Sequence, residues 1–215
     1  MTSEGQVRSR STVLATVLIV VLALGGGMMA ARLLLKPAPD FSELSATVFQ
    51  QPRALQSFEL LDHHGAAFTN ASLAGHWSFL FFGYTHCPDV CPTTLSVLNS
   101  VATRLTGTDD PVRFVFVTVD PERDTPEVLA RYVTYFNGEF IGVTGERAAI
   151  DELTRQVGVM HMRVAGEADA ASYLVDHTAS VLLFNPDGRF QGLFSPPLDA
   201  DTMAAEFLTI AGALR

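Results

Sequence analysis

The sequence predicts an α/β domain that follows one membrane-spanning helix. A long apolar run without charge lies near the N-terminus, from Thr12 to Ala31. Beyond it, short apolar runs bounded by glycine alternate with segments whose apolar residues recur at helical spacing. Both cysteines, Cys87 and Cys91, lie where the first buried run meets the first such helical segment. Alternating strands and helices are typical of a mostly parallel sheet covered by helices.

Composition limits the class of protein. The chain has 215 residues, enough for one ordinary domain and an appendage. After the first 36 residues, 22 acidic residues stand against 10 basic ones, a net charge of −12. This charge argues against nucleic-acid binding, which requires a basic surface. Two cysteines four residues apart are too few for a disulfide scaffold, and they point to redox chemistry or metal binding.

The apolar run from Thr12 to Ala31 has the length of a membrane span. At ~1.5 Å per residue it covers ~30 Å, the thickness of a bilayer's hydrocarbon core. A cleaved signal peptide usually has an apolar region of only ~7–15 residues, so the length favours an uncleaved anchor. Basic residues flank the run equally on both sides, and the cysteine pair and acidic domain favour a position outside the cytoplasm. We expect a cytoplasmic N-terminus at 1–11, an anchor at 12–31, a linker at 32–46 and the domain at 47–215.

The first half of the domain reads as a hairpin followed by strand, helix, strand and helix. Apolar residues flank the turn Asp62-His63-His64-Gly65, which predicts a short hairpin. Buried strands are expected at Trp77 to Phe82 and at Val112 to Val119. A helix should begin at Pro92, after the cysteines. A second helix should be capped by Thr125 and stopped by Asn137-Gly138.

The second half adds a helix, a hairpin and a closing helix. A short strand near Phe140 to Val143 precedes a helix that carries Ile150, Leu153 and Val157. Residues Gly166 to Ser172 read as a loop. Strong turn residues at Asn185 to Gly188 predict an antiparallel hairpin from Val181 to Phe194. The last helix has an apolar stripe of Met203, Phe207, Ile210, Ala211 and Leu214. This order is that of a thioredoxin-like fold with an N-terminal hairpin and insertions.

The cysteine stretch concentrates the chemistry. Each cysteine precedes a proline, and a residue before proline is pushed out of the helical region. We therefore expect Cys91 at the helix N-cap and Cys87 in the turn before it. A helix N-terminus favours negative charge, so both thiolates should be stabilised there. Taken alone, the C-x-x-x-C spacing fits either a redox-active dithiol or a ligand pair for a thiophilic metal.

The segment expected to face the cysteines separates these alternatives. Thioredoxin-like oxidoreductases carry a cis-proline there, whereas this chain has Asp176-His177-Thr178 and no proline between Pro126 and Pro186. His177 could complete a set of two thiolates and one imidazole, and soft sulfur ligands with one imidazole suit copper. Zinc would require a fourth ligand or a water.

Three stretches resemble the Sco/SenC family of membrane-anchored, thioredoxin-like copper proteins. They are 82–92, which reads FGYTHCPDVCP, 119–126, which reads VDPERDTP, and 173–177, which reads YLVDH. The resemblance implies that Cys87, Cys91 and His177 bind a copper ion. It implies a copper metallochaperone for the cytochrome c oxidase subunit that carries the binuclear copper centre, or a reductant of that centre's cysteines. Other copper chaperones or thiol reductants would be further partners, and the domain would lie on the extracytoplasmic side of a bacterial plasma membrane.

Some alternatives stay open. A membrane-anchored thiol–disulfide oxidoreductase or redox sensor is the second hypothesis, although we expect a delivery protein and not an enzyme. Asp120 and Asp176 either orient the metal ligands as a second layer or cap the turns that they begin. His86 should point away from Cys87. His63-His64 and Met160-His161-Met162 lie outside the family motif, and the latter reads either as a metal-binding cluster or as a strand with one half-buried face.

Overall fold

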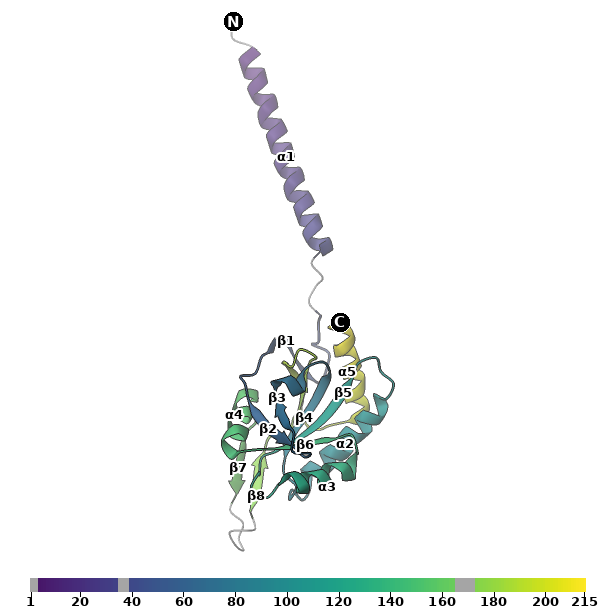
Figure 1. Ribbon diagram of the computed structural model, residues 1–215. Coiled ribbons are helices and arrows are strands. Elements are labelled where there is room, and N and C mark those ends of the chain that lie inside the picture. The colour runs from purple at the N-terminus through teal and green to yellow at the C-terminus, as the bar shows by residue number, and fades with distance from the viewer. Residues whose placement is uncertain (1–3, 35–38, 165–172) are drawn as a thin grey trace. The chain divides into compact units, whose positions relative to one another are not determined.

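The computed structural model describes residues 4–34, 39–164 and 173–215, so the expected loop at Gly166 to Ser172 lies outside the described residues. The chain divides into two compact units, Met1–Pro39 and Asp40–Arg215 (Figure 1). The first unit contains helix α1 (Glu4–Leu34). Within it, Thr12–Met29 has a mean hydropathy of 2.3, so by length and composition this helix can cross a membrane.

The second unit is built on an eight-stranded sheet of order β1-β10-β9-β4-β5-β6-β2-β3. Neighbours β4, β5 and β6 are parallel, and the other neighbouring pairs are antiparallel. The strands are β1 (Thr47–Arg53), β2 (Glu59–Asp62), β3 (Ala67–Thr69), β4 (Trp77–Gly83), β5 (Val112–Thr118), β6 (Ile141–Thr144), β9 (Val181–Phe184) and β10 (Phe190–Phe194). This arrangement confirms the predicted α/β class and both hairpins.

Helices pack on this sheet. They are η1 (Asn70–Leu73), α2 (Val90–Arg104), α3 (Pro126–Phe136), α4 (Arg147–Val157) and α5 (Ala200–Ala213). Helix α2 packs against α5 and touches α3, and in Figure 1 these three lie along one side of the domain while α4 lies on the other. Every residue of β4 is buried, as a strand covered on both faces must be. The central strand therefore presents the following loop, with its two cysteines, from a rigid base.

A separate two-stranded sheet forms an arm, β7 (His161–Val164) paired antiparallel with β8 (Leu174–His177). His161 lies opposite His177 in the register. The strand interpretation of the Met160-His161-Met162 segment is thus correct for its last two residues. Strand β8 was not predicted, because its four residues form no strong apolar run and a single one of them, Val175, is buried. Figure 1 shows this arm at the end of the domain away from the C-terminus.

Three details differ from the sequence-based expectations. Helix α2 begins at Val90, so Cys91 lies in its first turn and not at the N-cap. Pro92 is then the third residue of α2. Its missing N–H costs no helical hydrogen bond there, because the first four amides of a helix have no partner within the helix. Leu214 was expected in the buried apolar stripe of the last helix, but it is 41% exposed. It is the C-cap residue of α5, beyond the last buried residue of that helix, Ala211. Edge strand β1 was not predicted, and its Pro52 is compatible only with such an edge position.

Candidate metal centre

Two neighbouring cysteines and a histidine 86 residues further along the chain than Cys91 meet beyond the end of β4. Cys87 lies in the loop after this strand, Cys91 in the first turn of α2, and His177 at the end of β8. Their ligand atoms all lie within 4.8 Å of one another. Cys91 Sγ and His177 Nε2 are 3.2 Å apart. The fold therefore brings together the two sulfurs and the imidazole that the sequence singled out.

The backbone of this turn fixes both sulfurs. The Cys87 amide donates to the Tyr84 carbonyl at 3.3 Å, and the Cys91 amide donates to Cys87 Sγ at 3.4 Å. Gly83 permits the close approach of Cys91, since a Cβ at Gly83 would lie 2.9 Å from Cys91 Sγ. Cys91 is buried and Cys87 is partly exposed. Cys87 is thus the sulfur that another molecule can reach first.

The tautomer of His177 follows from its hydrogen bonds. Its Nδ1 lies 3.1 Å from the Thr178 carbonyl oxygen. A carbonyl only accepts, so Nδ1 carries the proton and the lone pair of Nε2 points towards Cys91 Sγ. Burial lowers the pKa of His177, although the Thr178 carbonyl and the nearby Asp176 oppose this. The neutral imidazole is favoured, which is the form that binds metals.

The pKa of the buried Cys91 thiol differs from the expectation that both thiolates are stabilised. Burial raises the pKa of the Cys91 thiol, and the neighbouring Cys87 adds to the effect. Desolvation of a buried thiolate therefore outweighs the favourable field of the helix N-terminus at Cys91. The amide of Cys91 instead points at Cys87 Sγ, so the helix terminus acts on the more exposed sulfur.

The two acidic residues proposed as a second layer are not bonded to the histidine. Asp120 is fully buried and accepts from the Tyr173 hydroxyl at 2.6 Å, and it also pairs with Arg123. Asp176 is exposed and influences His177 through its charge alone. The Asp120 side chain is therefore neither a direct partner of His177 nor a turn cap, and it bonds instead to Tyr173, the residue before β8.

Asp124 is a site residue that the sequence reasoning missed. Its buried carboxylate accepts from the Thr85 amide at 3.0 Å and from the hydroxyls of Thr85 and Thr118, both at 2.6 Å. It therefore ties the loop before Cys87 to the end of β5. One feature of the sequence could have identified Asp124: it is the second aspartate, four residues after Asp120, in the loop that follows a buried strand.

The remaining histidines lie outside this group. His86 has an exposed side chain, and its Nδ1 lies 3.1 Å from the Thr85 hydroxyl. His63 accepts from the Gly142 amide at 2.9 Å through Nδ1, and its ring is tilted by 46° against the His64 ring at a centroid distance of 4.0 Å. His161 lies 3.3 Å from Asp151. Among the described residues, the set of three cysteine, histidine or acidic side chains close enough to share a metal ion is Cys87, Cys91 and His177.

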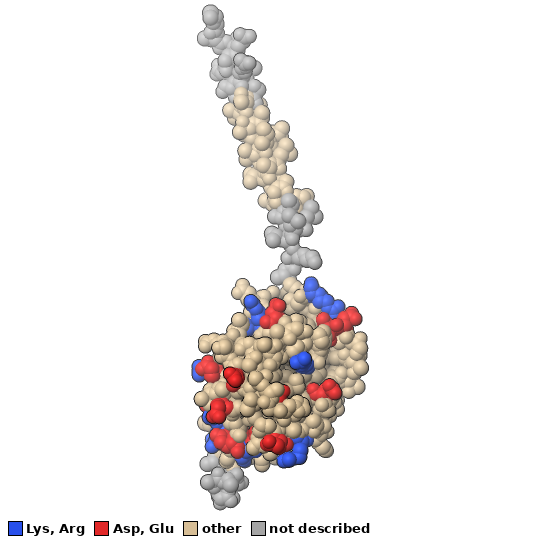
Figure 2. Space-filling view, in the orientation of Figure 1, with Lys and Arg blue, Asp and Glu red and all other residues tan. Residues whose placement is uncertain are grey.

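Charges on the domain surface are mixed. On the face shown in Figure 2, acidic and basic side chains are interspersed around a largely uncharged centre. Near the arm, Glu122 pairs with Arg147 and Arg163. These ion pairs connect the loop after β5 with α4 and β7, so they support the arm that carries His177.

A thioredoxin-like sheet with two cysteines at the turn from its central strand into the first crossover helix, and a histidine facing them, defines a class of thiol- and imidazole-based metal-binding proteins. The SCO1/SenC family model matches residues 47–212, and this chain belongs to that family. It is 39% identical over 137 residues to an SCO2-like protein of Rickettsia prowazekii, covering 64% of this chain and 67% of the relative. It is 33% identical over 205 residues to the human mitochondrial SCO2 homolog, covering 93% and 77%. The structure of copper-bound ScoI from Bradyrhizobium japonicum matches with a TM-score of 0.66 at 37% identity, covering 73% of this chain and 99% of that one.

Proposed function

We propose that this chain carries one copper ion on Cys87, Cys91 and His177 and delivers it to the cytochrome c oxidase subunit that holds the binuclear copper centre. The observation that supports this most directly is the convergence of two sulfurs and one imidazole nitrogen within 4.8 Å. The family membership supports the same conclusion, since a related ScoI protein is known with copper bound.

The donor set fits copper as cargo. Two thiolates and one imidazole are soft and borderline ligands that favour copper over hard cations. His177 is already the required tautomer, with Nε2 towards Cys91. Binding must displace the thiol proton of Cys91, because only the thiolate is a ligand. The ion would thus enter a site that is shaped before the metal arrives.

Exposure supports transfer to a partner. Cys87 and His177 are partly exposed, whereas Cys91 is buried. A partner's ligands would displace Cys87 and His177 first and the buried Cys91 last.

We propose that α1 anchors the chain in a bacterial plasma membrane, with residues 1–11 in the cytoplasm, 12–31 in the bilayer, 32–46 as a linker and the domain at 47–215 on the extracytoplasmic side.

A second candidate function is thiol–disulfide exchange, with other thiol reductants as partners. The free thiols of Cys87 and Cys91 are close to each other, and the Cys91 amide donates to Cys87 Sγ. That amide would stabilise a thiolate on the more accessible sulfur, which is the attacking group in disulfide exchange. Both functions use the same cysteines, so a cysteine variant does not separate them.

His177 separates them, because it closes a metal site and is not required for a dithiol. We expect His177→Ala to weaken Cu(I) binding by about 10–100-fold or more. Removing a residue that only positions a metal ligand already lowers metal affinity by that factor, and His177 would be a ligand itself. The Cys87/Cys91 pair should still oxidise and reduce reversibly. The measurements are competition with a chromophoric Cu(I) chelator on the reduced full-length chain, the dithiol reduction potential, and oxidase activity in cells carrying only the variant.

His86→Ala is the matched control, because His86 is adjacent to Cys87 but exposed and outside the group. It should leave Cu(I) affinity and oxidase activity at the wild-type level. If oxidase assembly survives in His177→Ala cells although tight copper binding is lost, copper delivery is wrong and the oxidoreductase function takes its place.

A further inference from the structure

Two methionines project from the arm that carries His177. Met162 belongs to β7, and the backbone of Met160 continues the same pairing: its amide donates to the Thr178 hydroxyl at 3.1 Å and its carbonyl accepts from the Thr178 amide at 2.9 Å. Residues two apart on an extended strand point to the same face. The two thioethers are therefore held side by side by a hydrogen-bonded backbone.

These methionines are unusually exposed. Met160 is 79% exposed and Met162 is 66% exposed. Methionine is ordinarily among the more buried residue types, and a thioether in water gains nothing from packing. Met203, in α5, shows the ordinary situation, at 2% exposure. Exposure of two neighbouring thioethers thus calls for a role outside the core.

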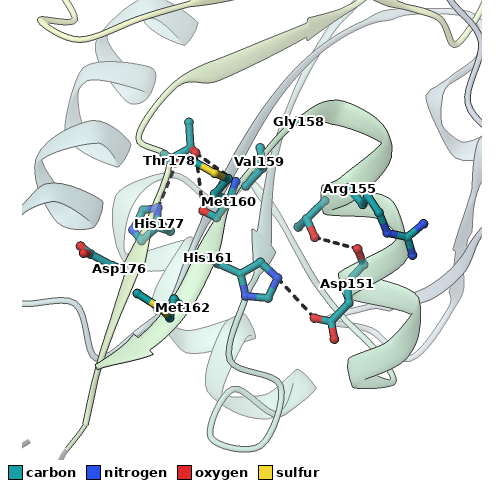
Figure 3. A pocket seen from close by; sticks show the side chains of 11 residues that line it. Asp151, Arg155, Gly158, Val159, Met160, His161, Met162, Asp176, His177 and Thr178 are labelled. Carbon is teal, nitrogen blue, oxygen red and sulfur yellow. Dashed lines mark hydrogen bonds and ion pairs between the residues drawn. The ribbon is translucent and has the colours of Figure 1, made fainter. Parts of the chain in front are cut away.

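The pair lies on the arm that carries the proposed copper ligand. Met160, Met162 and His177 line one pocket of about 1050 Å³ between α4 and the arm (Figure 3). Met162 is the cross-strand partner of Asp176, the residue immediately before His177. His161, between the two methionines, turns the other way and pairs with Asp151, as Figure 3 shows. Because His161 and His177 are cross-strand partners and share a face, the thioethers are the soft donors on the opposite face of the arm.

We propose that Met160 and Met162 form a second, weaker site for a cuprous ion, on the opposite face of the arm from His177. Thioether sulfur is a soft donor that selects Cu(I) over the hard cations. A site of two neutral sulfurs holds the ion loosely, and an ion held there is separated from His177 by the two-stranded arm. This inference rests on the proposed copper function.

The test follows methionine methyl groups directly. The full-length chain in detergent micelles, labelled with ¹³C at the methionine methyls, is titrated with Ag(I), a soft monovalent ion that does not change oxidation state. The chain has 6 methionines, and Met160→Leu and Met162→Leu assign the two signals. In the Cys87→Ser, Cys91→Ser variant, the Met160 and Met162 signals should shift together and saturate at one equivalent. Met203 should not move, and Zn²⁺ should cause no shift.

The wild-type chain provides the second measurement, which does not depend on folding of the cysteine variant. There the first equivalent of Cu(I) should bind the cysteines, and the second should shift the two methionine signals. Met160→Leu combined with Met162→Leu should abolish the second event and retain the first. Loss of the first event alone would contradict the proposed function and leave the thioether site standing. Absence of the methionine shifts, or equal shifts at Met28 and Met29 of α1, would overturn the thioether site.

Discussion

Replacing Gly83 by alanine puts one methyl group between the central strand and the candidate copper site. The added Cβ would lie 2.8 Å from Phe116 Cε2 and 2.9 Å from Cys91 Sγ. Real Cβ atoms essentially never come so close to another heavy atom, and both neighbours are buried, Phe116 at 1% and Cys91 at 0% exposure. Either the ring or the sulfur must therefore move.

The cost follows from ordinary overpacking. Inserting a methyl group into a packed core costs about 1–3 kcal/mol. For a chain of this size, that corresponds to a fall in Tm of roughly 2–12 °C. The same displacement moves Cys91 Sγ relative to His177 Nε2, which lies 3.2 Å away. We expect Cu(I) affinity to fall by about 10–100-fold, as for changes that disturb the orientation of a metal ligand.

The assay compares Gly83→Ala with Gly142→Ala. A Cβ at Gly142 would lie 3.0 Å from the Cβ of Leu129 and 3.3 Å from Cγ1 of Val133, so this control overpacks the contact between β6 and α3. Thermal unfolding and Cu(I) competition are measured on both full-length variants. Both should lose stability, and only Gly83→Ala should lose copper affinity. If Gly83→Ala binds copper like the wild type, or if Gly142→Ala loses affinity equally, the reasoning about Cys91 is refuted.

Two further predictions concern the arm and the anchor. Partial burial opposes ionisation of Glu122, but its pairing with Arg147 and Arg163 prevails and lowers its pKa from 4.5 to about 2. A depressed carboxyl pKa contributes stability above the unfolded value, and this contribution is lost as the pH falls through about 2. The difference in Tm between wild type and Glu122→Gln should thus be present at pH 7 and vanish near pH 2, and a difference independent of pH would contradict the ion-pair explanation. If α1 spans the bilayer as proposed, the full-length chain should also resist alkaline carbonate extraction, whereas release with peripheral proteins, or a mature N-terminus beyond Ala31, would contradict an uncleaved anchor.

Strong local signals made most of the fold predictable. The buried run of β4 and the turn residues of the β9–β10 hairpin each impose one structure on a short segment. The N-cap at Thr125, which accepts from the Val128 amide, was readable for the same reason. Strands β1 and β8 were not predicted, because neither has an apolar period of its own; β1 pairs with the distant β10, and β8 has a single buried residue.

The site residues were predictable in type but not in all their physical properties. Cys87 and Cys91 were chosen for their spacing at a strand-to-helix turn, and His177 for its expected place facing them and for the family resemblance. The pKa of Cys91 was not predictable, since the burial that raises it depends on side chains packed from other elements. The role of Asp120 could not be read either, because its partner Tyr173 lies 53 residues further along the chain.

The three stretches that carry the family resemblance converge on one structural unit. The first supplies both sulfurs and the third supplies the imidazole, and the second joins them. Asp124 of the second stretch holds Thr85, two residues before Cys87, through hydrogen bonds of 3.0 and 2.6 Å. Arg123 of the same stretch donates to the Tyr173 carbonyl at 3.2 Å and lies over the Tyr173 ring, 3.7 Å from its centroid. The loop after β5 thus contacts the cysteine turn on one side and, through Tyr173, the start of the strand that ends at His177 on the other.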